Sequence, residues 1–312
     1  MKSDLTLFAG TANQELARGV ARELGVDLGE CKVERFPDGE LSVRLEEPVR
    51  GREVFVVQPT SPPVNENLME LLAFADACRR ASSARVTAVV PYFGYARADK
   101  RDGKREPVTA SMVADLMQTV GIGHVVTVDV HTPQIEGFFR APLDNLTAVP
   151  ALAKALRGSL PGGVVVVSPD AGRVRMASEF AQRLQSPLAV LHKRRESGTK
   201  TRVTHMIGEV SGRACLIVDD MISTGGTIAE SVAALLEAGA SPGVRVVATH
   251  GLFVKDAREK MTRAGVSEVW TTDSVAVSEK DRPQLHIVSI APLLAGAISR
   301  FLKDESLSDL YD

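Results

Sequence analysis

The sequence has 312 residues, enough for two ordinary domains that each bury a core of their own. Hydrophobic residues make up 44% of it and charged residues 24%, proportions that are normal for a globular protein. The formal net charge of -2 provides no overall positive field, which excludes a bulk nucleic-acid binder, so we expect no nucleic-acid partner.

Neither the apolar runs nor the cysteines point to export or to a membrane. No apolar run approaches the roughly 18–20 residues that span a bilayer, and the N-terminus lacks a hydrophobic signal core. The three cysteines, Cys31, Cys78 and Cys215, are far apart and form neither a zinc spacing nor a disulfide framework. We therefore expect a reduced, cytoplasmic protein with no membrane partner.

Short β-branched runs alternate with longer amphipathic stretches along the chain. In chain order the apolar runs are "EVFVVQ", "RVTAVVPY", "HVVTVDVH", "GVVVVSPD", "ACLIVDD", "VRVVATHG" and "EVWTTDS". Continuous apolar runs of about four to six residues are typical of parallel strands that are buried on both faces. Helical patterns such as "NLMELLAFADACRRA" and "TIAESVAALLEAGA" lie between them. The pattern predicts an α/β fold with parallel sheets and crossover helices.

The order of these pieces repeats within the chain. A Gly-Arg pair, a strand, a loop, a helix and a second strand follow one another from residue 51 and again from residue 212. The repeat predicts two copies of one domain, at 1–148 and 149–312, with chance similarity of two α/β segments as the alternative. The loop "QPTSPPVNEN" of the first copy is a poor anion site because proline has no N–H. Only the second copy, with "DDMISTGGT", is therefore expected to keep a phosphate site.

Two segments of the first half combine aromatic, acidic and basic residues. "ERFPDGELSVRL", residues 34–45, places Phe36 before Pro37-Asp38-Gly39, which has the composition of a β-turn. An aromatic ring at this place also suits stacking on a purine. "PYFGYARADKRDGKREPVTA", residues 91–110, interleaves cations with acids and by itself predicts an exposed loop.

Acids and a histidine follow two of the predicted strands. Asp129 and His131 lie two residues apart, on the same side of one strand end, and Asp170 ends another strand. Mg²⁺ prefers oxygen ligands and keeps several waters, so a few protein groups are enough to hold it on a nucleotide. A structural role is the alternative for a single histidine, but the three groups together favour a magnesium site.

The second half contains a basic run and a glycine-rich loop. Lys193, Arg194 and Arg195 in "LHKRRESGT" precede a Ser/Gly-rich stretch expected to be mobile, and form either a solvated surface or a loop that closes over a polyphosphate. In "VDDMISTGGT", residues 218–227, glycines and hydroxyls lead into a predicted helix, whose first N–H groups suit a phosphate. Asp219 and Asp220 stand directly before them and suit sugar hydroxyls, which predicts a site for a phosphorylated sugar.

In this order, the motifs "RFPDGE", "DVHTPQ", "SPDAG", "HKRR" and "DDMISTGGT" resemble those of the ribose-phosphate diphosphokinases, also called phosphoribosyl pyrophosphate (PRPP) synthetases. The resemblance covers essentially the whole chain. It implies two tandem type I phosphoribosyltransferase-like domains, each with a central, mostly parallel sheet flanked by helices, and a C-terminal tail that packs back on the first domain. The implied reaction transfers the pyrophosphoryl group of Mg-ATP to the 1-hydroxyl of ribose 5-phosphate, giving PRPP and AMP.

The resemblance also implies partners and a role for each matching residue. It implies Mg²⁺, a homo-oligomer in the form of a hexamer built from dimers, and regulation by phosphate or ADP, with Ser306 and Ser308 resembling part of a regulatory site. The implied catalytic residues are Lys193 and Arg195, and the implied metal-site residues are His131, Asp170 and the nearby Asp129. The implied nucleotide contacts are Phe36, Asp38, Gly39, Glu40, Arg97 and Ala98. The implied ribose 5-phosphate contacts are Arg195, Asp219, Asp220, Ser223, Thr224, Gly225, Gly226 and Thr227.

Three positions depart from the usual pattern of these enzymes. Ser223 stands where an aspartate is common, so the sugar-phosphate loop carries one negative charge fewer. Ala98 replaces a frequent glutamine, which puts a side-chain contact with the nucleotide in doubt. The segment "SPDAGRVRMA" lacks the second glycine of the commoner "SPD-x-GG" form, a change that bears on substrate affinity or metal preference.

Three alternatives come from other classes of protein. A phosphoribosyltransferase would use the same loop to bind PRPP, but would need neither the duplicated domain nor "RFPDGE" and "KRR". A non-catalytic regulatory paralogue would keep the fold but lose Lys193, Arg195 or the metal-site residues, all of which are present here. A dinucleotide-dependent dehydrogenase is excluded because no G-x-G-x-x-G follows the first strand.

Overall fold

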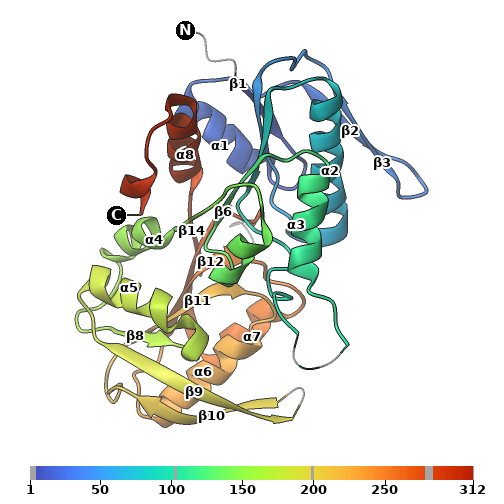
Figure 1. Ribbon diagram of the computed structural model, residues 1–312. Helices are drawn as coiled ribbons and strands as arrows, with labels where there is room; N and C mark the ends of the chain where they lie inside the picture. The colour runs from blue at the N-terminus through green and yellow to red at the C-terminus, as the bar shows by residue number, and fades with distance from the viewer. Residues whose placement is uncertain (1–4, 102, 104, 198–199, 278–283, 312) are drawn as a thin grey trace. The chain divides into compact units, whose positions relative to one another are not determined.

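The computed structural model describes residues 5–101, 103, 105–197, 200–277 and 284–311, with the backbone alone over the described part of 193–204 (Figure 1). No helix in the described part of the chain has the length and apolar character needed to cross a lipid bilayer.

The chain forms two compact units, which are described separately. The first unit consists of Met1–Thr147, Ser274–Ala276 and Ser289–Asp312, and the second of Ala148–Asp273 and Val277–Val288. The predicted domain limits, 1–148 and 149–312, mark the two halves of the sequence repeat, and they stay a prediction.

The first unit contains a five-stranded sheet with the strand order β1-β4-β5-β6-β7, in which all neighbouring strands are parallel. A separate antiparallel hairpin, β2–β3, lies between α1 and β4 in the sequence. The elements of this unit are β1 (Leu5–Ala9), α1 (Gln14–Leu24), β2 (Cys31–Arg35), β3 (Leu41–Leu45), β4 (Glu53–Val57), α2 (Val64–Arg80), β5 (Arg85–Val90), α3 (Thr109–Thr119), β6 (His124–Val128), the 3-10 helix η1 (Pro133–Phe138), β7 (Leu143–Leu146), α8 (Ala291–Lys303) and the 3-10 helix η3 (Ser308–Leu310).

The second unit contains a seven-stranded sheet with the order β10-β9-β8-β11-β12-β13-β14. Its strands are parallel except for the antiparallel pair β9–β10. The elements of this unit are α4 (Val149–Leu156), β8 (Val165–Ser168), the 3-10 helix η2 (Ala171–Arg173), α5 (Val174–Leu184), β9 (Leu188–Ser197), β10 (Lys200–Ile207), β11 (Cys215–Ile222), α6 (Gly226–Glu237), β12 (Val244–Gly251), α7 (Ala257–Ala264), β13 (Val266–Thr272) and β14 (Leu285–Val288).

The two units repeat one topology. The order β1-β4-β5-β6-β7 of the first sheet corresponds, strand for strand, to β8-β11-β12-β13-β14 of the second. In both units a hairpin follows the helix that comes after the first strand, β2–β3 after α1 and β9–β10 after α5. The predicted fold class, a duplicated α/β protein with parallel sheets and flanking helices, is therefore confirmed. The hairpins with "RFPDGE" and with "HKRR" occupy equivalent places in the two copies.

Continuous apolar runs form the central strands because both faces of each sheet are covered. Every residue of β11, Cys215–Ile222, is buried, although the strand carries two aspartates near its end. In the first unit β4 is buried from Val54 to Val57. Parallel strands end at the same edge of a sheet, so the loops that follow β4 and β11 each lie at the carboxyl edge, where α/β proteins bind ligands.

The last long helix of the chain belongs to the first unit. Helix α8 lies beside α1 (Figure 1), so closely that a Cβ atom placed on Gly19 would be 2.9 Å from the Cβ of Ala291. The ring of Phe301 packs edge-on against His124, with 4.5 Å between ring centroids. His124 also contacts Asp144 through Nε2, at 2.6 Å from Oδ2.

Candidate functional site

The predicted sugar-phosphate loop lies between strand β11 and helix α6 in the second unit. Gly225 is the N-cap of α6 and has a φ of 72°, and no side chain caps this helix. A Cβ atom at Gly225 would lie 2.9 Å from the carbonyl oxygen of Ala257, so glycine meets both the conformational and the steric demand. A helix leaves its first N–H groups without intrahelical acceptors and has a positive dipole end there, which suits a phosphate.

The two acids before this loop are almost completely buried. Asp219 is 8% exposed and Asp220 is 2% exposed. Burial, together with the neighbouring Asp220 carboxylate, raises the pKa of the Asp219 carboxyl well above its usual range. The Nε of Arg173 lies 3.5 Å from Oδ1 of Asp219 and 3.3 Å from Oδ1 of Asp220, and this cation acts in the opposite direction on that pKa. The acid pair is thus a desolvated pair of acceptors with the guanidinium of Arg173 beside it.

Asp170 follows strand β8, the parallel neighbour of β11. Its Oδ1 accepts a hydrogen bond of 2.8 Å from the backbone N–H of Gly172, which caps the short helix η2. The hydroxyl of Ser168 donates to the Asp170 carbonyl oxygen at 2.7 Å. These contacts fix the turn that carries Asp170 and Arg173, so the predicted metal-site residue and the acid pair belong to adjacent strand ends of the second unit.

The predicted nucleotide segment forms the tip of hairpin β2–β3 in the first unit. The N–H of Gly39 donates to the Phe36 carbonyl at 2.9 Å, and the N–H of Phe36 donates to the Glu40 carbonyl at 2.8 Å. Asp38 accepts through Oδ1 from the N–H of Glu40 at 3.1 Å. The Phe36 ring is 47% exposed at this tip. The hairpin therefore presents an open aromatic face together with two exposed carboxylates.

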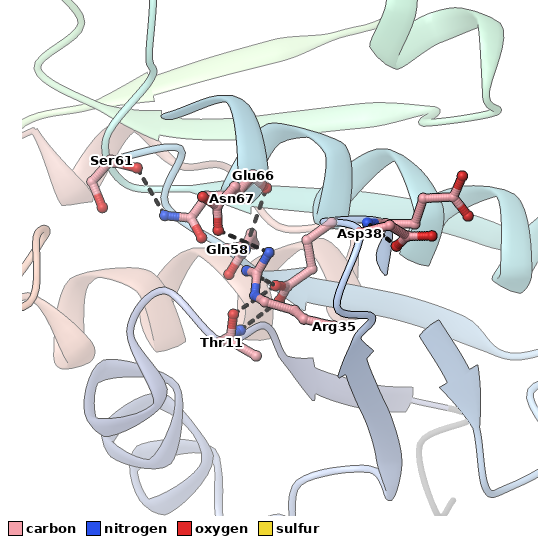
Figure 2. Close-up of polar contacts among 9 residues, drawn as sticks. Thr11, Arg35, Asp38, Gln58, Ser61, Glu66 and Asn67 are labelled. Carbon is pink, nitrogen blue, oxygen red and sulfur yellow. Dashed lines mark hydrogen bonds and ion pairs between the residues drawn. The ribbon is translucent and has the colours of Figure 1, made fainter. Parts of the chain in front are cut away.

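A buried carboxylate on α2 anchors this hairpin. Figure 2 shows Arg35, the last residue of β2, reaching α2, where its guanidinium lies 3.0 Å from Glu66 and 3.3 Å from Glu70. The Glu70 side chain is 0% exposed. It also accepts from the N–H and the hydroxyl of Thr11, each at 2.6 Å. One carboxylate thus joins the hairpin to the loop that follows β1.

The other predicted residues of the first unit lie on two linked loops. Arg97 is exposed, and Ala98 is held by its backbone, which donates to Tyr95 at 2.8 Å. Asp99 accepts from the Thr132 hydroxyl at 2.7 Å, which ties this loop to the one that carries His131.

Asp129 is buried at the end of β6 and has a φ of 41°. A positive φ at a residue other than glycine is strained, and such strain is concentrated at functional sites. His131 is half-buried two residues further on. Among the described residues no group of three or more His, Cys, Asp and Glu side chains gathers as a metal site.

The predicted catalytic cations lie on strand β9. The backbone of Lys193 pairs with Val203 of β10, and that of Arg195 with Thr201. Their side chains lie outside the described part of the structure. The sequence pattern did not predict a strand here because the run is dominated by charged residues.

Three residues of these sites were not singled out by their sequence pattern. Arg35 stands inside a quoted motif, but its partner Glu70 is 35 positions away. Arg173 occupies the place of the missing glycine in "SPDAGR", and that departure was the available signal. Contacts of this kind arise from the tertiary fold and leave no local pattern.

Comparisons with known proteins cover nearly the whole chain. A family model for the N-terminal domain of ribose phosphate pyrophosphokinase matches residues 5–121, and one for the phosphoribosyl transferase domain matches residues 144–282. The ribose-phosphate pyrophosphokinase of Fusobacterium nucleatum is 42% identical over 99% of each chain. That of Chromobacterium violaceum is 44% identical over 99% of this chain and 95% of its own.

A solved structure agrees with these relatives. The crystal structure of phosphoribosylpyrophosphate synthetase from Mycobacterium smegmatis matches with a TM-score of 0.90 and 43% identity, over 96% of this chain and 99% of that one. The chain therefore belongs to the ribose-phosphate pyrophosphokinase family.

Proposed function

We propose that the protein transfers the pyrophosphoryl group of Mg-ATP to the 1-hydroxyl of ribose 5-phosphate, giving PRPP and AMP for nucleotide and amino-acid biosynthesis. The observation that carries this proposal is the buried acid pair, Asp219 and Asp220, placed directly before a helix whose N-cap is Gly225. This arrangement suits a phosphorylated ribose, and it occurs in a chain 42% identical over nearly its full length to a ribose-phosphate pyrophosphokinase.

Ribose 5-phosphate is expected to bind at the carboxyl edge of the second sheet. The loop Ser223–Thr227 and the start of α6 would hold the 5-phosphate through N–H groups and hydroxyls. Asp219 and Asp220 would accept hydrogen bonds from the ribose hydroxyls and so orient the sugar. Charge-assisted hydrogen bonds of this type are stronger than neutral ones, so burial of the pair gives both affinity and orientation.

The nucleotide is expected to contact the first-unit hairpin and loop described above. The exposed ring of Phe36 offers a face for adenine, and Asp38, Gly39 and Glu40 surround it at the same tip. Arg97 is exposed and supplies a cation suited to phosphate oxygens. Ala98 contributes its backbone alone, because its side chain has no polar group.

Magnesium fits the donor chemistry of the proposed residues. Asp129 and Asp170 supply carboxylate oxygens, the ligands that Mg²⁺ prefers, and His131 supplies a nitrogen or a contact through water. When bound, the ion would neutralise charge on the triphosphate. A cation that keeps most of its waters needs few protein ligands, so residues from this set suffice without a dense cluster.

The chemical step rests on positioning and on charge. Holding the 1-hydroxyl of the sugar in line with the β-phosphorus converts a bimolecular encounter into an effectively unimolecular step. Lys193 and Arg195 are proposed to stabilise the negative charge that develops on the transferred phosphoryl oxygens. We assign no general base.

We further propose that the protein acts in the cytoplasm as a homo-oligomer, a hexamer built from dimers, with phosphate and ADP as regulators. The family resemblance supports these points. The hydroxyl oxygens of the tail residues Ser306 and Ser308 lie 2.9 Å apart, within hydrogen-bond distance of each other.

A labelling experiment tests the reaction. The protein is incubated with ribose 5-phosphate, Mg²⁺ and ATP labelled in the γ-phosphate, and the label should move onto the sugar while AMP accumulates. Formation of ADP with a labelled sugar bisphosphate would contradict the proposal and indicate an ordinary kinase. Binding of ATP without turnover would favour a regulatory paralogue.

A variant of the basic run sharpens this test. Lys193→Ala should lower turnover about 100-fold or more, as loss of a group that stabilises transition-state charge does. Binding of ribose 5-phosphate, measured by calorimetry, should stay nearly unchanged. A near-normal rate would remove Lys193 from the mechanism.

A further inference from the structure

Arg173 lies against the acid pair and is itself largely buried. Its side chain is 15% exposed, and those of Asp219 and Asp220 are 10% and 3% exposed. A single atom, Nε, is within 3.5 Å of one carboxylate and 3.3 Å of the other. Arginine stands here at the place where the commoner "SPD-x-GG" form has glycine.

Arg173 lies beside the acid pair because the strands that precede them, β8 and β11, are parallel neighbours. The register of β8 and β11 pairs Val167 with Ile217, so the turn after β8 runs beside the end of β11. Asp170 caps η2 through Gly172, and the N–H of Arg173 donates to the Asp170 carbonyl at 3.4 Å. The turn is therefore fixed by its own hydrogen bonds, and the long Arg173 side chain reaches the acids from it.

Two adjacent buried carboxylates need a cation to remain good acceptors. Charges removed from water are costly unless an opposite charge lies close, and like charges side by side add to the cost. Arginine meets this need at every physiological pH because its guanidinium does not lose its proton.

A second departure changes the local charge in the same direction. Ser223, in the loop that follows the acid pair, replaces the aspartate common in related enzymes. Each departure makes the site more positive by one unit of charge, since Arg173 adds a cation and Ser223 removes an anion. The two changes together reduce the need for an external cation at the sugar-phosphate site.

We infer that Arg173 is a positioning residue of the ribose site, which holds Asp219 and Asp220 as acceptors so that ribose 5-phosphate binds without a divalent cation at the acid pair. The inference rests on the proposed function, since it takes ribose 5-phosphate as the ligand of this site. Magnesium then serves the nucleotide and is not required for binding of the sugar phosphate.

Calorimetric titration of the full chain with ribose 5-phosphate, without ATP, tests the inference in two buffers, one with EDTA and one with Mg²⁺. The wild-type affinity should be the same in both within about 2-fold. Arg173→Gln keeps most of the side-chain volume but removes the charge, and should bind about 10-fold or more weakly in EDTA, as expected when a charged hydrogen-bond partner is lost. Arg173→Gly restores the common form and should regain affinity when Mg²⁺ is added.

Two further variants separate charge from folding. Arg173→Lys keeps a cation and should bind within about 3-fold of wild type in EDTA, since charge is the main requirement. Arg175→Gln, an exposed change two residues further along on α5, should bind as wild type does. Thermal unfolding of each variant confirms that the protein titrated is folded.

The outcomes separate this inference from the proposed function. Wild-type binding that is lost in EDTA, or an Arg173→Gln variant with undiminished affinity, overturns the role of Arg173 and leaves the proposed reaction in place. A loss in Arg173→Lys as large as in Arg173→Gln overturns the charge requirement. Wild type that fails to bind ribose 5-phosphate in both buffers overturns the proposed function as well.

Discussion

The loop after β4 and the loop after β11 occupy the same place in the repeated topology but are built in opposite ways. In the first unit the loop is filled by its own polar side chains, Gln58, Thr60 and Ser61, which are at most 2% exposed. Gln58 accepts from the N–H of Ala12 at 3.1 Å and donates to the Asn67 carbonyl at 3.3 Å, and Asn67 donates to the Ser61 carbonyl at 2.8 Å (Figure 2).

In the second unit the equivalent segment carries an acid pair near the end of β11 and a glycine N-cap at the start of α6. Asp219 and Asp220 replace the Gln-Pro of the first unit, and Gly225 leaves the start of α6 without a side-chain cap. In the first copy the polar groups of the loop are satisfied by hydrogen bonds within the protein, whereas the second copy carries charged acceptors suited to a ligand. At this one position of the repeated topology, the first copy thus uses its polar groups for stability, whereas the second has the acceptors that the proposed ribose 5-phosphate site requires.

Removal of charge from the acid pair should have the largest effect. Asp219→Asn combined with Asp220→Asn should lower kcat/KM for ribose 5-phosphate about 100-fold or more, because hydrogen bonds to charged groups contribute about 1.5–3 kcal/mol each. Steady-state kinetics measures this fall in kcat/KM.

The matched change in the first unit is Gln58→Ala. It leaves the partly buried N–H of Ala12 without this acceptor and removes a fully buried side chain, so it should lower the free energy of unfolding by about 1–3 kcal/mol. Its kcat/KM should change little while the protein is folded. If kcat/KM fell as far as in the double variant, the two loops would not differ in the way described.

Gly225 and Gly51 offer the next comparison, because they share a backbone conformation but differ in their neighbours. Their φ values are 72° and 71°, and a Cβ at Gly51 would meet no atom within 4 Å. Gly51→Ala should therefore cost only the backbone strain, about 1–2 kcal/mol in unfolding free energy.

Gly225→Ala adds a clash with the Ala257 carbonyl and displaces the start of α6. It should cost more stability than Gly51→Ala and weaken binding of ribose 5-phosphate about 10-fold, since small displacements at a binding site have large effects. Urea unfolding and calorimetry measure both quantities, and equal losses in the two variants would contradict the steric argument.

A smaller effect, on the KM for ATP, is expected from changes in the contacts that anchor hairpin β2–β3 to α2. Glu70→Gln removes the buried charge that pairs with Arg35, and should raise the KM for ATP about 5-fold while the KM for ribose 5-phosphate stays constant. Glu66→Gln, the matched change at the exposed partner of Arg35, should alter either KM by less than about 2-fold, because exposed ion pairs contribute little. Equal effects on both substrates would indicate a general loss of structure.

The smallest expected effect is a gain in stability. The pKa of Asp219 is raised in the folded protein, by burial first and then by Asp220, so the ionised form costs stability above the usual aspartate pKa. Asp219→Asn removes this cost and should raise the unfolding temperature by a few degrees at pH 7, with a smaller gain at pH 5. An unfolding temperature below that of wild type at pH 7 would show that Arg173 fully offsets the burial of Asp219.

Features of this fold that depend on neighbouring residues in the sequence could be predicted, whereas contacts between residues far apart in the sequence could not. Strands such as β4, β8 and β11 could be predicted because burial on both faces leaves a continuous apolar run. Strand β9 could not be predicted, because its charged residues hide any alternation. The glycine-rich loop was predictable because backbone conformation restricts residue type locally.

The anchoring contacts were not predictable in the same way. Arg35 and Glu70 are separated by 35 positions, and Thr11 and Glu70 by 59. Each of these residues is ordinary in its own segment. Only the tertiary fold, in which α2 contacts both the hairpin β2–β3 and the loop after β1, brings them together.

The position of helix α8 in the first unit has a consequence for biosynthesis. Helix α8 packs against α1, so the first unit is completed only by residues that lie beyond the second unit in the sequence. At translation rates of about 5–20 residues per second, the ribosome needs roughly ten to thirty seconds to go from the end of β7 to α8. During that interval the second unit is synthesised, and the side of α1 that packs against α8 is not yet covered by it. The first unit is therefore begun first and completed last.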